Sequence, residues 1–308
     1  MGSKALGGTE LMMNRINQID PTLLDQFQII HSRVRDLDMD KKRILVLHDL
    51  PLDPECEHLR DGGWKKFDLL VFVSHWQQEK FRDYLDVPYS AGIVLPNAIE
   101  PIAEHTKPKD KVRLMYYSTP HRGLDILFAA FKTLAREFPE IELNVFSSFE
   151  LYGWPENDKP FRELFDQLRQ HPQINYHKSV SNDRIREEIE RSHIFAYPST
   201  WQETSCLCLI EAMSGGLQCV HSSLAALPET SMGLTQMYGF VEDRQQHADR
   251  FYHNLKYSIM TVKRDFDVDG ALLGGKIKND KLNADFRYNW KNRAQQWDGL
   301  LRSVVSAS

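Results

Sequence analysis

The fold that we expect is decided by one segment, Ser199-Thr200-Trp201-Gln202-Glu203-Thr204-Ser205-Cys206-Leu207-Cys208-Leu209-Ile210-Glu211-Ala212-Met213-Ser214-Gly215-Gly216. An apolar run typical of a buried strand, Ile194 to Pro198, leads into it. A polar loop then opens into a short helix, and the two glycines end that helix. Carboxylates accept hydrogen bonds from hydroxyls, and the free N–H groups at a helix start bind anions. The segment therefore predicts a crevice for a ligand that carries both hydroxyls and phosphates, such as a nucleotide sugar.

Three stretches of the chain resemble one enzyme family, in that family's order. The first stretch resembles the Glu-x7-Glu signature of the family-4 retaining glycosyltransferases. In it, Glu203 is followed by seven residues, then by Glu211, Ala212-Met213 and a glycine pair. Leu6-Gly7-Gly8-Thr9-Glu10 is similar to their glycine-rich first loop. Ser118-Thr119-Pro120-His121-Arg122-Gly123-Leu124 is similar to the segment that grips the donor diphosphate. The resemblance implies an α/β protein of GT-B architecture, with two Rossmann-like domains whose parallel sheets face a central cleft.

Composition sets limits on other functions. The 308 residues carry a formal net charge of −5 with scattered positive charges, which gives no reason to expect nucleic acid. No apolar run approaches the roughly 20 residues that span a bilayer, and no signal-peptide core opens the chain. The four cysteines have neither metal-ligand nor disulfide spacing. We therefore expect a cytoplasmic protein with reduced thiols. A peripheral contact with a membrane stays open, because acceptors of such enzymes are often linked to lipids.

Alternating strand and helix patterns predict two α/β domains. The polar stretch Pro101 to Asp110 predicts a linker, so we place an N-terminal, acceptor-side domain at 1–104 and a donor domain at 105–284. Lys263 to Asn283 is expected to be irregular. In 285–308, Trp290 to Val305 has helical periodicity, and the resemblance implies that this helix packs back on the first domain. That domain is shorter than is usual in the family, so it is either minimal or completed by a partner.

The resemblance assigns roles to the residues of the opening segment. Glu203 would bind hydroxyls of the donor sugar, and Glu211, two turns into the helix, would bind the ribose. Thr204 and Ser205 are suited to cap the helix. The N–H groups of three donor-binding positions would face the diphosphate: Ser205, Cys206 and Leu207.

Residues outside that segment would complete the donor site. Arg122, with the hydroxyls of Ser118 and Thr119, would neutralise the leaving diphosphate; an exposed loop arginine is the alternative. Gly7 and Gly8 would let a ligand approach the backbone. The resemblance also implies that His48, after the strand Ile44 to Leu47, orients the donor sugar; a purely structural histidine at the strand end is the alternative.

No metal is expected. Asp36-Leu37-Asp38-Met39-Asp40 contains Asp-x-Asp but is typical of a solvated turn. Asp265 to Gly270 begins like a calcium loop, yet its twelfth position is Lys276 instead of a glutamate.

The predicted activity is metal-independent transfer of a sugar, with retention, from a nucleoside diphosphate sugar to a hydroxyl acceptor in glycan or polysaccharide synthesis. The acceptor would be a glycan, a glycolipid or another hydroxyl compound. A UDP or GDP sugar is expected as substrate, with no cofactor. One alternative is a non-catalytic nucleotide- or glycan-binding module on a degenerate transferase scaffold, and another is a GT-B phosphorylase or epimerase-like enzyme. The sequence leaves the base, the sugar and the oligomeric state open.

Overall fold

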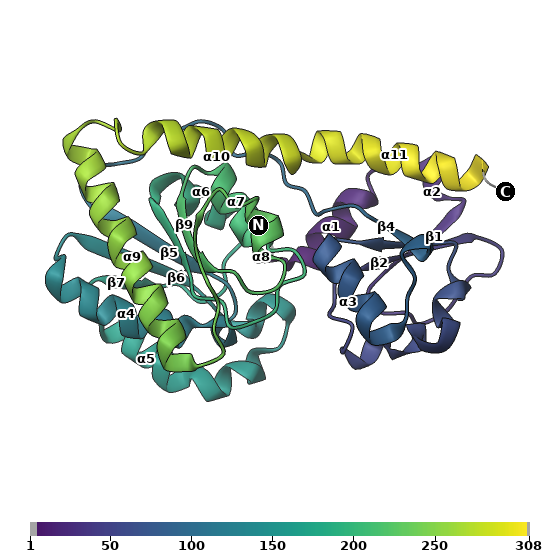
Figure 1. Cartoon of the computed structure of the whole chain (residues 1–308), viewed down its shortest axis with the longest axis horizontal. Coiled ribbons are helices and arrows are strands. Elements are labelled where there is room, and N and C mark those ends of the chain that lie inside the picture. The colour runs from purple at the N-terminus through teal and green to yellow at the C-terminus, as the bar shows by residue number, and fades with distance from the viewer. Residues whose placement is uncertain (1–4, 307–308) are drawn as a thin grey trace. The chain divides into compact units, whose positions relative to one another are not determined.

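Two parallel β-sheets, each with helices on its faces, organise the chain (Figure 1). The computed structural model describes residues 5–306. Within this range the chain divides into two compact units. One comprises Gly8–Glu100, Gln202–Leu207 and residues 287–306, and we call it the N-unit. The other comprises residues 5–7, Pro101–Trp201 and Cys208–Phe286, and we call it the C-unit.

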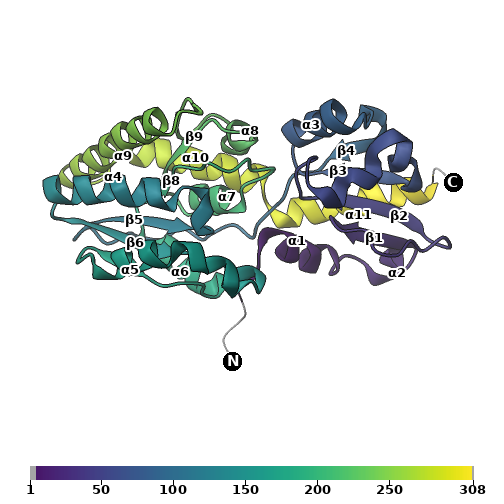
Figure 2. The same ribbon diagram turned by 90° about the horizontal axis from the view of Figure 1, so that it is seen from below.

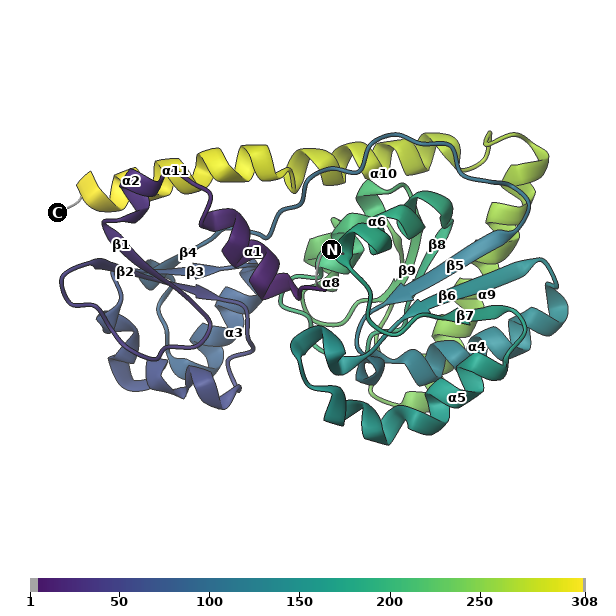
Figure 3. The ribbon, with the colours of Figure 1, turned by 180° about the vertical axis from the view of Figure 1, so that it is seen from behind.

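The sheet of the N-unit has four parallel strands, in the order in which they occur in the chain. They are β1 (Phe27–His31), β2 (Lys42–Leu47), β3 (Leu69–Phe72) and β4 (Gly92–Val94). One face is covered by α1 (Gly8–Ile16), α2 (Pro21–Leu24) and α11 (Trp290–Ser306). The other face is covered by α3 (His75–Leu85) and the 3₁₀ segment Pro54–Lys66, with a further 3₁₀ turn at Tyr89–Ala91 (Figure 3).

Alternation along β2 explains these two layers. Ile44 and Val46 point into the core that holds Trp297 and Leu301 of α11, and Leu45 and Leu47 point into the core on the opposite face. Since both faces of the sheet are covered, the strand is a continuous apolar run instead of an alternating one. The C-terminal helix is thus a part of the N-unit core.

The sheet of the C-unit has six parallel strands in the order β10-β9-β8-β5-β6-β7. Their bounds are Val112–Tyr117 (β5), Ile141–Phe146 (β6), Ile174–Tyr176 (β7), Ile194–Tyr197 (β8), Gln218–Ser222 (β9) and Gln236–Tyr238 (β10). The chain adds β6 and β7 on one side of β5 and then crosses to add β8 on the other side. The carboxyl ends of β5 and β8 therefore form a topological switch point, where ligands bind in open α/β sheets.

Helices connect and cover the C-unit strands. They are α4 (Leu124–Glu137), α5 (Arg162–Gln170), α6 (Asn182–Arg191), α7 (Leu207–Ser214), α8 (Leu227–Ser231), α9 (Arg244–Asp267) and α10 (Gly274–Arg287). Figure 2 shows α4 and α9 on one face of the sheet and α5 and α6 on the other. Three 3₁₀ turns, Pro120–Arg122, Phe149–Tyr152 and Pro155–Phe161, follow β5 and β6.

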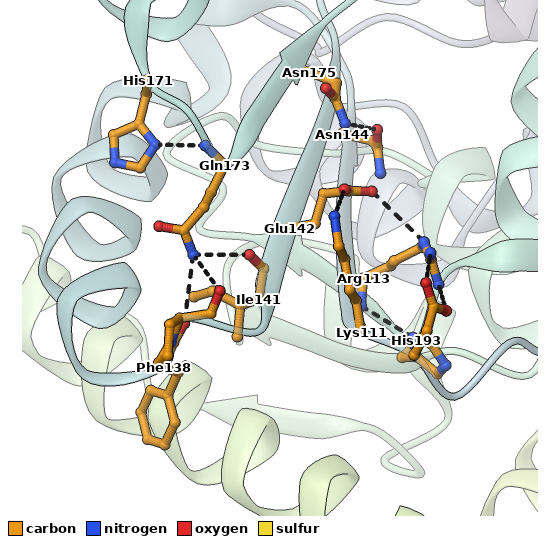
Figure 4. A network of polar contacts seen from close by, with 12 residues as sticks. Lys111, Arg113, Phe138, Ile141, Glu142, Asn144, His171, Gln173, Asn175 and His193 are labelled. Atoms are coloured by element: carbon orange, nitrogen blue, oxygen red, sulfur yellow. Dashed lines mark hydrogen bonds and ion pairs between the residues drawn. The ribbon is translucent and has the colours of Figure 1, made fainter.

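A polar network braces the amino ends of β5 and β6, opposite the switch point (Figure 4). The Arg113 N–H donates to His193 Nδ1 over 3.0 Å, and the Arg113 guanidinium donates to Asp110 over 2.8 and 2.7 Å. Lys111 Nζ donates to the Glu142 carboxylate over 2.8 Å. Because these groups bind one another, this edge of the sheet has a structural role.

The expectation that Lys263 to Asn283 is irregular is wrong. α9 continues to Asp267, and α10 begins at Gly274. The buried positions of α10 include Asp280 beside Ala284, so the buried face lacks the apolar period that would reveal it. Lys276 pairs with Asp280, and Lys281 donates to Asp285 over 2.8 Å and to the Ser214 carbonyl over 2.7 Å. Ion pairs one turn apart thus hold this helix, together with contacts to α7.

Candidate donor site

The loop after β8 forms the centre of the site. Helix α7 begins at Leu207 and ends where Gly216 takes a φ of +65°. The N–H groups of Gly216 and Leu217 return to the carbonyls of Met213 and Ala212, each over 3.0 Å, which closes the helix end. The glycine pair therefore stops the helix as expected, and its first turn follows directly on the loop that carries Glu203.

Glu203 and Thr204 belong to the N-unit. The Glu203 side chain is buried, with 7% of its surface exposed. The Thr204 hydroxyl donates to the His48 carbonyl over 2.8 Å. The expected capping role of Thr204 is therefore wrong, since its hydroxyl is used elsewhere and α7 begins three residues later. Ser205 also lies two residues before α7. The hydrogen bond of Thr204 holds the loop at the carboxyl end of β2.

Glu211 lies within the C-unit, at the fifth residue of α7, which is just over one turn into the helix instead of two. Arg186 of α6 places a guanidinium nitrogen 3.6 Å from its carboxylate. The Glu211 side chain is 12% exposed, and the Arg186 side chain is 27% exposed. Arg186 also donates to the Pro101 carbonyl over 3.2 Å. The carboxylate is thus oriented by a cation that is itself anchored.

The loop after β5 approaches the end of β8. Gly123 has a φ of +101°, and a Cβ there would lie 2.2 Å from the Pro198 carbonyl oxygen. Only glycine allows this approach. Thr119 is buried, and its hydroxyl oxygen has no hydrogen-bond partner among residues 5–306. Its carbonyl accepts from the Tyr116 hydroxyl over 2.8 Å. Ser118 precedes it and Arg122 follows, both partly exposed, so the three lie on one short loop at the switch point.

An aromatic cluster joins three strand ends of the C-unit. The His121 ring stacks on Phe149 at 5.2 Å and meets Trp201 edge-on at 4.9 Å. The His121 carbonyl accepts from the Thr200 hydroxyl over 3.2 Å. Burial, and then the neighbouring Arg122, lower the pKa of His121 to about 4, so the ring is neutral at neutral pH. Sequence patterns assign these three rings no role in the site. Their one signal in the sequence is that each follows a strand.

His48 follows β2 in the N-unit and is partly buried. Its N–H donates to the Ser32 hydroxyl over 3.2 Å. Its Nε2 lies 3.4 Å from Nδ1 of His31, the last residue of β1. Burial, and then His31, lower the pKa of His48 to about 3, and burial lowers the pKa of His31 to about 4. A neutral imidazole therefore stands at this strand end.

Gly7 and Gly8 connect the two units along the chain. Just before them, the side-chain amide of Asn182 accepts from the Leu6 N–H over 2.9 Å and donates to the Leu6 carbonyl over 3.2 Å. α1 begins at Gly8, where a Cβ would lie 3.1 Å from a methyl carbon of Leu207. The glycine at position 8 thus lets the start of α1 contact the first residue of α7. Cys206, beside it, is buried.

The two metal-like patterns are local turns. The Asp38 carboxylate accepts from the Asp40 N–H over 3.0 Å, and the Asp265 carboxylate accepts from the N–H groups of Leu272 and Leu273 over 2.9 and 2.8 Å. Within residues 5–306, no three His, Cys, Asp or Glu side chains gather as a metal ion requires. Over the same range, each helix is too short or too polar to cross a bilayer.

Residues 99–248 match the family described as "Glycosyl transferases group 1". The phosphatidylinositol N-acetylglucosaminyltransferase gpi3 subunit of Schizosaccharomyces pombe is 22% identical over 223 residues, which are 69% of this chain and 44% of the relative. The chain thus spans less than half of that relative.

Solved glycosyltransferase structures share the fold. A glycosyltransferase of Rickettsia africae superposes with a TM-score of 0.70 at 14% identity, covering 100% of this chain and 85% of the other. HepE of Anabaena, solved with UDP-glucose, superposes with a TM-score of 0.60 at 18% identity, covering 85% and 72%. Residues 99–248 are therefore similar to the glycosyl transferases group 1 family, and the chain has the α/β architecture of the GT-B glycosyltransferases.

Proposed function

We propose that the chain transfers a sugar from a nucleoside diphosphate sugar to a hydroxyl acceptor, in the synthesis of a glycan or polysaccharide. One observation carries the proposal. Within a glycosyltransferase domain, the segment after β8 holds two buried glutamates, one on the loop and one in the first turns of α7. The glutamates can accept hydrogen bonds from sugar hydroxyls, and the helix start can receive the phosphates.

The donor side of the site follows from these contacts. Glu211, oriented by Arg186, would accept from the ribose hydroxyls. The N–H groups of Ser205, Cys206 and Leu207 would bind the diphosphate, and so would Ser118, Thr119 and Arg122. Gly7 and Gly8 would allow the ligand to approach the chain. The complex of HepE with UDP-glucose supports a nucleotide-sugar donor, of which a UDP or GDP sugar is the proposed form.

The chemical step would need charge stabilisation more than a base. When the bond from the anomeric carbon to the phosphate oxygen breaks, its electron pair leaves with the diphosphate. Arg122 and the N-terminus of α7 would stabilise that anion. Glu203 and the neutral His48 would hold the electron-poor sugar through its hydroxyls. The acceptor oxygen would attack from the face of the departing phosphate, which takes the acceptor proton. This route retains the anomeric configuration and uses no metal or cofactor.

The acceptor would be a glycan, a glycolipid or another hydroxyl compound. The S. pombe relative is described as a phosphatidylinositol N-acetylglucosaminyltransferase subunit, which favours testing a lipid-linked acceptor and an N-acetylglucosamine donor first. A cytoplasmic enzyme that contacts a membrane peripherally would meet such an acceptor.

The test is a thermal-shift panel of UDP, GDP, ADP and their glucose, N-acetylglucosamine and mannose conjugates, each with magnesium or with EDTA. A ligand at about 100 times its dissociation constant adds roughly 2.7 kcal/mol of stability. We expect a shift with one base, in either buffer, that Glu211→Gln diminishes. No shift with any nucleotide would contradict the proposal, and binding without turnover would favour the non-catalytic module.

A further inference from the structure

Two histidines end neighbouring strands of the N-unit. His31 is the last residue of β1, and His48 directly follows β2. The strands are parallel, with His31 opposite Val46, so both rings lie at the carboxyl edge of the sheet. His31 Nδ1 and His48 Nε2 are 3.4 Å apart. Direct contact between two imidazole nitrogens requires that one ring donates and the other accepts.

The ring geometry supports a hydrogen bond instead of face-to-face stacking. The two ring planes differ by 16°, and their centroids are 5.7 Å apart. This centroid distance exceeds the 3.4 Å between the two nitrogens by about twice the distance from the centre of an imidazole ring to one of its nitrogens. Both nitrogens therefore lie near the line that joins the centroids. The rings meet edge to edge in nearly one plane, as an N–H···N bond requires.

The backbone around His48 is held on both sides. Ser32, with a φ of +60°, donates its N–H to the Val46 carbonyl over 2.9 Å and accepts from the His48 N–H over 3.2 Å. The His48 carbonyl accepts from the Thr204 hydroxyl over 2.8 Å. What remains free is rotation of the imidazole, and His31 constrains that rotation through Nε2. Nδ1 of His48 makes no hydrogen bond to the other residues that the structure describes.

We propose that His31 is a positioning residue, which donates from Nδ1 to Nε2 of His48 and thereby fixes His48 as the tautomer with its hydrogen on Nδ1. His48 would then offer an N–H donor to an oxygen of the bound donor sugar. The direction follows from His31 Nε2, which is buried without a partner in the described part of the chain. A buried N–H without a partner is rarer than a buried acceptor without one, so Nε2 of His31 carries no hydrogen. The catalytic part of this assignment rests on the proposed function.

The pair stays neutral in its surroundings. Burial lowers the pKa of both rings below 6.5. The Asp49 carboxyl group, next along the chain, bonds the Ser32 hydroxyl and has a pKa raised by burial. Asp53, Glu55 and Arg33 are the other charged groups around Asp49. A neutral pair holds each hydrogen on its own Nδ1, so His48 presents one fixed N–H without adding charge beside the sugar.

The first test is ¹⁵N NMR of histidine-labelled native protein at pH 7, with the two rings assigned through His31→Asn and His48→Gln variants. We expect both rings as neutral tautomers protonated on Nδ1. A hydrogen on Nε2 of His48, or fast averaging between its tautomers, would overturn the assignment. This result needs no substrate, so it is independent of whether the proposed function holds.

The second test compares donor turnover of His31→Asn and His31→Leu. An asparagine amide nitrogen can take the place of Nδ1, whereas leucine cannot donate. We expect His31→Leu to lower kcat about tenfold, the loss of one good hydrogen bond, with KM nearly unchanged. His31→Asn should retain most of kcat, and His58→Asn, a control elsewhere in the N-unit, should retain all of it. Equal losses in both His31 variants, or a change in KM alone, would mean that His31 acts only in folding.

Discussion

Arg186 of α6 holds the carboxylate of Glu211 in α7, with a nitrogen–oxygen distance of 3.6 Å. Both belong to the C-unit, and Arg186 is itself tied to the Pro101 carbonyl. Since the Glu211 side chain is 12% exposed, its charge is compensated by this cation before any ligand arrives. The pair therefore sets the direction in which Glu211 can accept from a ribose.

Replacing Arg186 should weaken nucleotide binding. We expect Arg186→Gln to lower the affinity for the preferred nucleoside diphosphate about tenfold, comparable to Glu211→Gln, since either change removes one charge-assisted contact. The double variant should lose little more than either single one, because both changes disable the same unit. Isothermal titration measures all four proteins. Fully additive losses would show that the two residues act independently.

The bond from Thr204 to the His48 carbonyl should matter for both stability and turnover. Thr204→Val keeps the shape and removes the hydroxyl, which leaves a carbonyl without its donor at a cost of about 1 kcal/mol. We expect a lower melting temperature and slower turnover, measured by circular dichroism and by release of nucleoside diphosphate. Thr204→Ser, which retains the hydroxyl, should behave as the native protein does. If Thr204→Val is as stable and as active as the native protein, this hydrogen bond contributes to neither stability nor turnover.

Gly123 should tolerate no side chain. Its φ of +101° disfavours other residues, and a Cβ would lie 2.2 Å from the Pro198 carbonyl oxygen. We expect Gly123→Ala to cost about 3 kcal/mol, from backbone strain and overpacking together. Gly153→Ala is the matched control: φ is +74°, but a Cβ would meet no atom within 4 Å, so about 1 kcal/mol is expected. Equal melting temperatures for the two variants would contradict the close approach of the loops after β5 and β8.

The structure should lose stability when His193 becomes protonated. Its Nδ1 accepts from the Arg113 N–H, and burial, with Lys107 and Arg113 nearby, lowers its pKa to about 4. The unfolded chain binds this proton near pH 6.5, so stability falls with decreasing pH by about 1.4 kcal/mol per unit between pH 6.5 and 4. His31, His48, His121 and His221, also with lowered pKa values, add to the same trend.

His193→Asn isolates that contribution, because the asparagine oxygen can accept from the Arg113 N–H at any pH. We expect the native protein and the variant to differ least in stability at pH 8. Between pH 8 and pH 5, the variant should lose less stability than the native protein does. Thermal melts across this range provide the comparison. Parallel pH profiles for the two proteins would show that His193 does not titrate as described.

Local patterns are sufficient to predict strands such as β2 and β8 and the short helix that Gly215 and Gly216 end, whereas the short β10 is missed. Runs such as Ile44 to Leu47 are apolar because both sheet faces are covered, and that signal lies within the run itself. Helix α10 gave no such signal, since its buried face includes Asp280 and its stabilising partners lie in α7 and the preceding chain. Helix formation there is decided by tertiary contacts, which override local composition.

The partners of the site residues could not be predicted for the same reason. The sequence predicts that the Thr204 hydroxyl caps α7, but this hydroxyl donates to the His48 carbonyl, 156 positions away. Likewise, nothing near Glu211 in the sequence indicates Arg186, and nothing near His48 indicates His31. The residue types suited to the chemistry can be recognised locally. Their orienting partners are brought in by the fold.

The central claim is tested most directly by following nucleotide-sugar consumption by NMR with native protein, Glu203→Gln and Glu242→Gln, in EDTA, with simple glycosides and phosphatidylinositol vesicles as acceptors. Glu203 is buried in the candidate site, whereas Glu242 is an exposed loop glutamate. The account predicts release of nucleoside diphosphate by the native protein and by Glu242→Gln, and a loss of about a hundredfold or more in Glu203→Gln. Undiminished release by Glu203→Gln, or a donor that binds the native protein and is never consumed, would contradict it.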